Sequence, residues 1–244
     1  ILGHEGIGIV TEVGKNVKNI KPGDRVSVDP NDMCGECYYC RNAMAHFCTN
    51  AIGYGTTYPG GFAEYVTVRA KQVFRIPDSL PLESAALVET VSCCLHGIDL
   101  CNIRTGQTVF IIGAGPIGLL MLQLAKMAGA GKIIVSEIIP EKRELALKYG
   151  ADIVIDPLNE DIGKVLSENC KNVDCVIECA GTVKTIEQAV KYAGKGSTVM
   201  MFGLVAPDAT ASIKPYEIFQ KEIRLTSSFI NPYTFDRAIE VLSL

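Results

Sequence analysis

The sequence predicts an α/β protein in two parts, a β-rich domain over residues 1–90 and a doubly wound parallel sheet over residues 91–244. Residues 1–30 hold short runs of alternating polarity that end in turns, which is typical of antiparallel hairpins. Beyond residue 90, short β-branched runs alternate with longer helical ones, which indicates a parallel sheet covered by helices on both faces. We expect the boundary inside a helix over residues 87–100.

The elements of the first part are short. Strands are expected at Gly6–Val10 and Pro22–Val28, each bounded by turn residues. A cysteine-rich lobe follows over residues 33–49, and another strand is expected at Phe62–Val68, after a Gly-Gly turn.

The second part alternates regularly between strands and helices. A buried strand at Thr108–Gly113 leads into an apolar helix at Pro116–Gly129, and the pattern repeats with a strand at Lys132–Glu137 and a helix at Pro140–Tyr149. Further strands are expected at Asp152–Ile155, Asp174–Glu178, Ser197–Phe202 and Ile223–Ser227.

Charge and cysteine usage narrow the classes of function. A net charge of −4 gives no basis for binding nucleic acid through bulk charge, and no apolar run reaches membrane-spanning length. Six of the ten cysteines lie scattered in apolar surroundings, and no secretory leader is recognisable. We therefore expect a cytoplasmic protein with reduced cysteines.

A glycine-rich turn joins the first strand and helix of the second part. Gly113, Gly115 and Gly118 have the G-x-G-x-x-G form: the first permits the tight turn, the second lets the backbone approach a pyrophosphate, and the third lets helix and strand pack closely. Pro116 and Ile117 begin the helix, whose free N–H groups favour an anion. This context predicts a Rossmann dinucleotide site.

Glu137 ends the second strand 19 residues after Gly118, where an acid that binds the adenosine ribose hydroxyls is expected. Its carboxylate would repel a 2′-phosphate, so NAD is favoured over NADP. Lys142, in the helix that follows, is a further candidate contact of the dinucleotide. The alternative is a structural glycine turn beside an exposed glutamate.

Four cysteines crowd into one short stretch, at Cys34, Cys37, Cys40 and Cys48. Four thiolates fill a tetrahedral zinc site and leave no open position, so the zinc would be structural. A loop this poor in apolar residues would gain its folding free energy from the metal. An iron–sulfur cluster and unligated thiols are the alternatives. The acidic balance opposes a zinc ribbon that binds nucleic acid.

The start of the chain resembles a known family. Gly3-His4-Glu5-x2-Gly8-x5-Gly14-x2-Val17 is similar to the zinc-site signature of the zinc-dependent medium-chain dehydrogenases. The cysteine lobe, the stretch Gly61–Tyr65 and the glycine turn follow in that family's order, and Ser228–Phe235 is similar to the sorbitol, arabinitol and threonine dehydrogenase group. The resemblance implies a GroES-like catalytic domain followed by a Rossmann domain.

The same resemblance implies that His4 binds a catalytic zinc and that Glu5 binds it or lies just outside its ligands. Glu89 matches a further acidic zinc-site residue of polyol dehydrogenases, although Cys93 or His96, on the same helical face, could take its place. Such a site leaves zinc an open position for a substrate hydroxyl, from whose carbon a hydride passes to the nicotinamide.

The chain departs from the family at both ends. Family members carry a cysteine zinc ligand and a threonine or serine of the proton relay upstream of the Gly-His-Glu motif, and they return to the catalytic domain after the sheet. The sequence begins at Ile1 and stops at Leu244, and we assign its last residues to a helix of the sheet domain. We therefore expect a piece of a longer protein.

The sequence supports two classes of function. The first is an NAD-linked oxidoreductase of secondary alcohols, with polyols the first candidate and L-threonine the second; the other is a non-catalytic, nucleotide-binding zinc protein. The last strand, Ile223–Ser227, should lie at a sheet edge, which predicts pairing into a homodimer or homotetramer. The alternative is an edge covered by Pro232 and the helix that follows.

Overall fold

The computed structural model describes residues 1–244, which form two compact units. One unit consists of Ile1–His96 together with Phe229–Leu244, and the other of Gly97–Ser228. Helix α3 (Val88–Cys101) begins in the first unit and ends in the second. The division between the two units therefore falls within α3, between His96 and Gly97. None of the helices is long and apolar enough to cross a membrane.

The second unit is built on a six-stranded sheet in which every neighbouring pair is parallel. Its strands follow the order β11-β10-β9-β6-β7-β8, so the direction of winding reverses between β6 and β9. The bounds are β6 Thr108–Ile112, β7 Lys132–Ser136, β8 Ile153–Ile155, β9 Cys175–Glu178, β10 Thr198–Met201 and β11 Arg224–Ser227. This is the doubly wound sheet that the sequence predicted.

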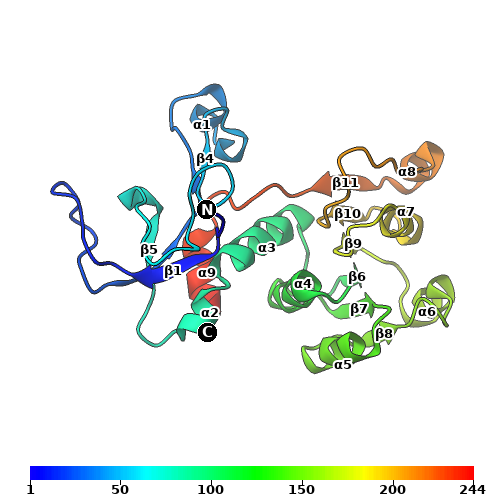
Figure 1. Ribbon diagram of the computed structural model, residues 1–244. Coiled ribbons are helices and arrows are strands. Elements are labelled where there is room, and N and C mark those ends of the chain that lie inside the picture. The colour runs from blue at the N-terminus through cyan, green and yellow to red at the C-terminus, as the bar shows by residue number, and fades with distance from the viewer. The chain divides into compact units, whose positions relative to one another are not determined.

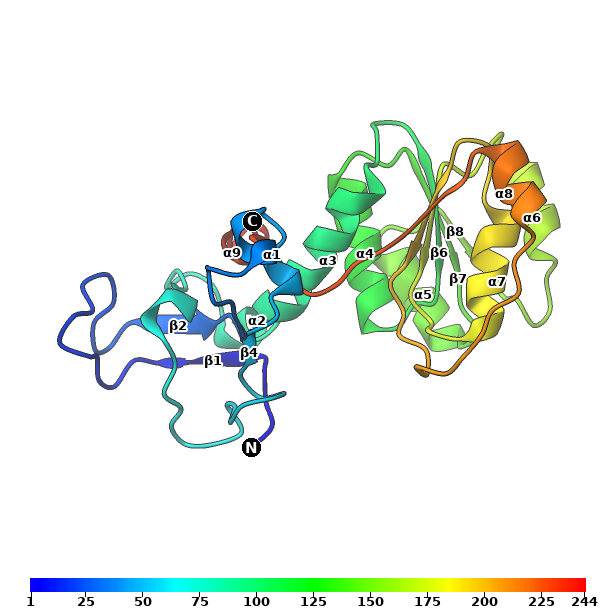
Figure 2. The same cartoon turned by 90° about the horizontal axis from the view of Figure 1, so that it is seen from above.

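Helices cover both faces of this sheet (Figures 1 and 2). Helices α4 (Pro116–Met127) and α5 (Pro140–Lys148) lie on one face, whereas α6 (Ile162–Asn169), α7 (Val183–Tyr192) and α8 (Pro215–Lys221) lie on the other. Because both faces are covered, the central strands are mainly apolar and side chains such as Phe110 and Val176 are completely buried.

The first unit has a small antiparallel sheet in the order β1-β2-β5. Helices α2 and α9 contact each other, and Leu242 of α9 packs on the cluster of Ile76, Leu80 and Ala85. The remaining pair, β3 and β4, leads into and out of the cysteine-rich lobe. The bounds are β1 Gly6–Ile9, β2 Arg25–Val28, β3 Asn31–Asp32, α1 Tyr38–Arg41, η1 Ala45–Phe47, β4 Ile52–Gly53, η2 Ala70–Gln72, β5 Val73–Arg75, α2 Leu82–Ala85 and α9 Phe235–Leu242.

The strand predicted at Phe62–Val68 is not formed. The chain there has no regular structure, and the Phe62 side chain is 80% exposed. The preceding turn is instead tied to the first residues of the chain, because Gly61 N–H donates to Gly3 O at 2.8 Å and Phe62 N–H donates to Leu2 O at 2.9 Å. Alternating polarity makes a strand only where a partner strand supplies hydrogen bonds, and residues 63–68 have none.

The last residues also differ from the prediction, since Phe229–Leu244 belongs to the first unit and not to the sheet domain. Polar contacts explain the difference. The buried Asn231 accepts a hydrogen bond from Asn31 Nδ2 at 2.6 Å and donates one to Asp29 Oδ1 at 3.3 Å. Thr234 Oγ1 donates to the Ser92 carbonyl at 2.7 Å. The chain thus returns to the first unit after β11.

Candidate zinc and dinucleotide sites

The four cysteines of the lobe converge on one point. The sulfurs of Cys34, Cys37, Cys40 and Cys48 all lie within 4.8 Å of one another, with Cys34 Sγ 3.5 Å from Cys48 Sγ and 3.9 Å from Cys40 Sγ. A tetrahedral zinc ion with Zn–S bonds of about 2.3 Å holds its sulfurs about 3.8 Å apart. The donor set therefore fits zinc. An iron–sulfur cluster would push the sulfurs further apart, because iron and sulfide ions stand between them.

Backbone N–H groups surround these sulfurs. Peptide N–H groups of Cys40 and Thr49 bond to the Cys37 sulfur and lower the pKa of its thiol to about 6. The N–H groups of Glu36 and Cys37 approach Cys34 Sγ at 3.5 and 3.4 Å and lower the pKa of that thiol. Burial acts in the opposite direction on Cys40 and raises its pKa to about 12. Metal binding requires thiolates, and the backbone favours two of them in advance.

The lobe is anchored at its base by ion pairs. Asp32, which is buried in β3, lies 2.6 Å from Lys71 Nζ and 3.1 Å from Arg69 Nη1. Lys71 Nζ also donates to the carbonyl of Met33 at 2.7 Å. These contacts fix the direction in which the chain enters the lobe.

A second cluster joins the start of the chain to helix α3. The potential ligand atoms of His4, Glu5 and Glu89 lie within 4.8 Å of one another. His4 and Glu5 are exposed, whereas Glu89 is only 7% exposed and burial raises its pKa. A buried carboxylate beside an imidazole and a second carboxylate fits a divalent cation, which would offset the cost of its burial.

Neighbouring side chains orient this cluster. Thr90 Oγ1 donates to Glu5 Oε1 at 2.6 Å, and Cys93 Sγ donates to Glu89 Oε1 at 3.3 Å. Cys93 thus lies on the predicted face but as a donor to Glu89, and the His96 ring lies edge-on to His46 at 5.5 Å. Of the three alternatives in α3, Glu89 is the one that lies with His4 and Glu5.

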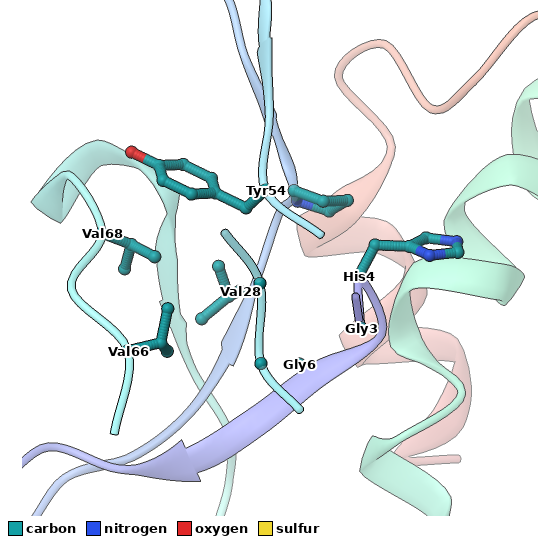
Figure 3. A pocket seen from close by; sticks show the side chains of 10 residues that line it. Gly3, His4, Gly6, Val28, Tyr54, Val66 and Val68 are labelled. Atoms are coloured by element: carbon teal, nitrogen blue, oxygen red, sulfur yellow. The ribbon is translucent and has the colours of Figure 1, made fainter. Parts of the chain in front are cut away.

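The ring of His4 is directed away from the nearby apolar hollow of the same unit. Figure 3 shows Val28, Val66 and Val68 facing one another in this hollow beside Tyr54, while the imidazole points in the other direction, toward α3. His4 thus borders the hollow while its imidazole is directed away from it.

The glycine turn of the second unit has the predicted shape. Gly113 follows β6 with a φ of 99°, which favours glycine. A Cβ on Gly118 would collide with the carbonyl oxygen of Gly113, so helix and strand can pack only through glycine. At Gly115, by contrast, a Cβ would meet nothing within 4 Å. Open space beside the free N–H groups of Ile117 and the first turn of α4 fits a pyrophosphate.

Glu137 lies beside this turn and is buried. Its Oε2 accepts the Ala114 N–H at 2.7 Å and its Oε1 accepts the Ile139 N–H at 2.9 Å. Arg143 donates to the Glu137 carbonyl at 2.8 Å and pairs with Asp156 at 3.0 Å, so its guanidinium is already occupied. Lys142 is half-buried in the first turn of α5, one residue away from this arginine.

Sequence reasoning missed several roles in and near these sites. Thr90 carried no signal beyond its place one residue after Glu89 in a helix, and Cys93 was expected as an alternative to Glu89 and not as its hydrogen-bond donor. The glycine motif does not identify Ala114, because this residue acts through its backbone N–H, which donates to Glu137. Glu178 ends β9 with a completely buried side chain, and its position at a strand end was the one clue available.

Comparison with known proteins assigns the family. A family model described as "Zinc-binding dehydrogenase" matches residues 116–243, and one described as "Alcohol dehydrogenase GroES-like domain" matches residues 1–78. D-arabinitol dehydrogenase 1 of Uromyces fabae is 35% identical over 99% of this chain and 70% of its own length. L-threonine 3-dehydrogenase of Pyrococcus abyssi is 41% identical over 84% of this chain and 59% of its own length.

Solved structures agree. A structure from Sinorhizobium meliloti 1021, bound to NADP, superposes with a TM-score of 0.96 at 41% identity, over 99% of this chain and 72% of the other. The chain therefore belongs to the zinc-binding dehydrogenase family. This result confirms the family that the sequence motifs indicated. It also confirms the predicted combination of a GroES-like domain with a Rossmann sheet.

The glycine turn yields a stability prediction. Gly118→Ala should lower the free energy of unfolding by about 2 kcal/mol, because the new methyl overlaps the Gly113 carbonyl. Gly115→Ala, at a helix N-cap with open space and a φ of −67°, should cost less than about 1 kcal/mol. Urea unfolding followed by circular dichroism compares the two variants. Equal losses would contradict the assignment of distinct roles to these glycines.

Proposed function

We propose that the protein is an NAD-linked zinc dehydrogenase that oxidises a secondary hydroxyl group of a polyol. The observation that carries the proposal is the convergence of His4, Glu5 and Glu89 in a member of this family. The arabinitol dehydrogenase relative, which aligns with nearly the whole chain, supports a polyol substrate. L-threonine is the second candidate, supported by the 41% identity of the threonine dehydrogenase relative.

Two zinc ions are proposed, with different roles. The four-cysteine lobe would hold a structural ion, since four thiolates fill its coordination. His4, Glu89 and either Glu5 itself or a group that it orients would hold the other, with room for a substrate oxygen. Zinc in such a site lowers the pKa of a bound hydroxyl.

The protein's own residues prepare this second site. Thr90 fixes Glu5 through Oε1 and leaves its other carboxylate oxygen for a ligand. Cys93 fixes the Glu89 carboxylate in the same way. Burial raises the pKa of the Cys93 thiol, so Cys93 acts as a hydrogen-bond donor and leaves the negative charge to the carboxylates.

The activity itself is tested by oxidation of a panel of polyols and L-threonine with NAD, followed by the absorbance of the reduced nicotinamide. His4→Ala should abolish turnover and lower the bound zinc from two ions to one, while NAD binding is retained. Cys94→Ser, in helix α3 like Glu89 but outside the cluster, is the control and should keep both ions. Binding of NAD and zinc without turnover of any alcohol would favour the non-catalytic alternative.

The lobe is tested separately through metal content. Cys40→Ser should release the structural zinc and lower solubility, because the lobe lacks an apolar core of its own. Cys170→Ser, in a half-buried position far along the chain, is the matched control and should leave zinc content unchanged. Unchanged zinc in the Cys40 variant would refute a four-cysteine site.

The preference for NAD over NADP is proposed from Glu137. Its buried carboxylate, held by two N–H groups, would repel a 2′-phosphate, and the nearby Arg143 is already paired. The Sinorhizobium relative is solved with NADP, so direct affinity measurements must decide this preference.

We expect NAD to bind about tenfold or more tightly than NADP in calorimetric titrations. Glu137→Ser should weaken NAD and narrow that ratio, because it removes both the ribose acceptor and the repulsion. Glu141→Ser, an exposed acid in the next helix, should leave the ratio unchanged. Equal affinity of the unmodified protein for both dinucleotides would show that Glu137 does not discriminate.

A homodimer or homotetramer is proposed from the edge strand. Strand β11 pairs only with β10, so its other edge carries unpaired backbone groups, and no strand of the sheet unit covers it. The Arg224 N–H donates to Ser197 O, so by alternation the N–H of Ser227 faces the free edge. Ser227 is exposed, which leaves this donor accessible within its unit.

Light scattering at micromolar concentration tests the pairing. Ser227→Pro removes one edge donor without breaking a bond to β10 and should shift the assembly toward monomer. Ser227→Ala keeps the N–H and is the matched control. A strictly monomeric unmodified protein would refute edge pairing. We also propose a cytoplasmic location from the scattered cysteine usage of the sequence, since thiols stay reduced in the cytosol.

A further inference from the structure

Glu178 ends strand β9 and is used by neither site described above. Its side chain is completely buried. Oε1 accepts the N–H groups of Ala180 and Gly181, each at 2.8 Å, whereas Oε2 is buried without a hydrogen-bond partner. Burial of a carboxylate is costly even when it is hydrogen-bonded, so this glutamate weakens the core that it occupies. A function at the carboxyl end of β9 would explain its presence.

The loops around Glu178 are packed too closely for side chains. A Cβ on Gly203, which follows β10, would come within 2.7 Å of Glu178 Oε2. A Cβ on Gly181 would come within 2.6 Å of the Leu204 carbonyl oxygen, and Gly181 has a φ of 68°. The Glu178 carbonyl accepts the N–H groups of Phe202 and Gly203 at 3.0 and 2.8 Å. The loops that leave β9 and β10 are therefore locked together around this one residue.

The same loop touches the glycine turn. A Cβ on Gly113 would lie 3.1 Å from the nitrogen of Ala180, and a Cβ on Gly118 would lie 3.7 Å from Cys179 Cβ. The backbone at residues 179–180 therefore packs directly against the turn proposed to hold the pyrophosphate. Glu178 orders this loop because its Oε1 accepts two consecutive N–H groups.

The order of the strands in the sheet indicates which half of a bound dinucleotide would lie next to residues 179–182. A dinucleotide lies across the carboxyl ends of a doubly wound sheet, at the point where the strand order reverses. Here that point is between β6 and β9. Glu137, the proposed ribose acceptor, directly follows β7 on one side of β6. The adenosine half then lies toward β7, and the nicotinamide riboside half lies over β9 and β10.

The loop after β9 is also the counterpart of the glycine turn in the second half of the fold. Both strands are followed by an Ala-Gly pair, Ala114-Gly115 after β6 and Ala180-Gly181 after β9. In the second half the carboxylate of Glu178 occupies the N–H groups of this pair. A phosphate would find those donors filled, which suits a half-site that receives the phosphate-free end of the cofactor.

We propose that Glu178 is a positioning residue for the nicotinamide riboside half of the bound cofactor. It holds residues 179–182 and the Gly203 backbone in one arrangement, so that this half of the crevice is formed before the cofactor binds. The inference rests on the proposed dinucleotide binding.

Calorimetric titration with NAD and with ADP tests the inference, because ADP has the adenosine and pyrophosphate groups but no nicotinamide riboside. Glu178→Met keeps the volume but removes the acceptors, and it should weaken NAD about tenfold while ADP changes less than about twofold. Glu178→Gln retains an amide oxygen for both N–H groups and should bind NAD within about threefold of the unmodified protein. Glu137→Met is the matched control and should weaken both ligands equally.

Gly203→Ala provides a second route to the same result. Its methyl group would press on Glu178 Oε2 and Gly181, and it should reproduce the selective loss of NAD even if Glu178→Met does not fold. Equal weakening of NAD and ADP by these two variants, or no weakening of NAD, would overturn the inference. Failure of the unmodified protein to bind either ligand would instead overturn the proposed function, so the two failures are distinguishable.

Discussion

The reversal of strand order between β6 and β9 is the constraint on which the second unit depends. Chains that leave these two neighbouring strands run to opposite faces of the sheet, so their first peptide groups are not covered by a crossing helix. Those N–H groups need acceptors, and the protein supplies carboxylates: Glu137 binds the Ala114 N–H, and Glu178 binds the N–H groups after β9. Glycines allow the loops to approach closely enough for this arrangement.

The first unit is stabilised in a different way. Its cysteine lobe has only short helical turns and no buried residue in α1 or η1, so packing contributes little to its stability. Four sulfurs with the separations of a tetrahedral zinc site can replace a core, and the buried Asp32 with its two cations joins the lobe to the sheet. Ion pairs and metal coordination thus stabilise the lobe, where buried apolar area is lacking.

Local patterns account for what the sequence predicted well. Strands β6, β7 and β9 are continuous apolar runs, and the glycine turn is specified within six residues, so no distant partner is needed to recognise them. Phe62–Val68 has the alternation of a strand but lacks a partner, and Phe229–Leu244 is held by Asn231 and Thr234 through residues more than 140 positions away. Such long-range bonds have no signal in the local sequence.

The same limit applies within the sites. His4, Glu5 and the four cysteines are recognisable because their spacing belongs to a motif, whereas the roles of Thr90 and Cys93 follow from where α3 meets the start of the chain. Glu137 and Glu178 show the difference most clearly. Both lie at the carboxyl end of a parallel strand and both accept a backbone N–H two residues on, yet Glu137 lies toward the expected adenosine side and Glu178 on the opposite side of β6. Only strand order separates their roles, and strand order is a property of the whole sheet.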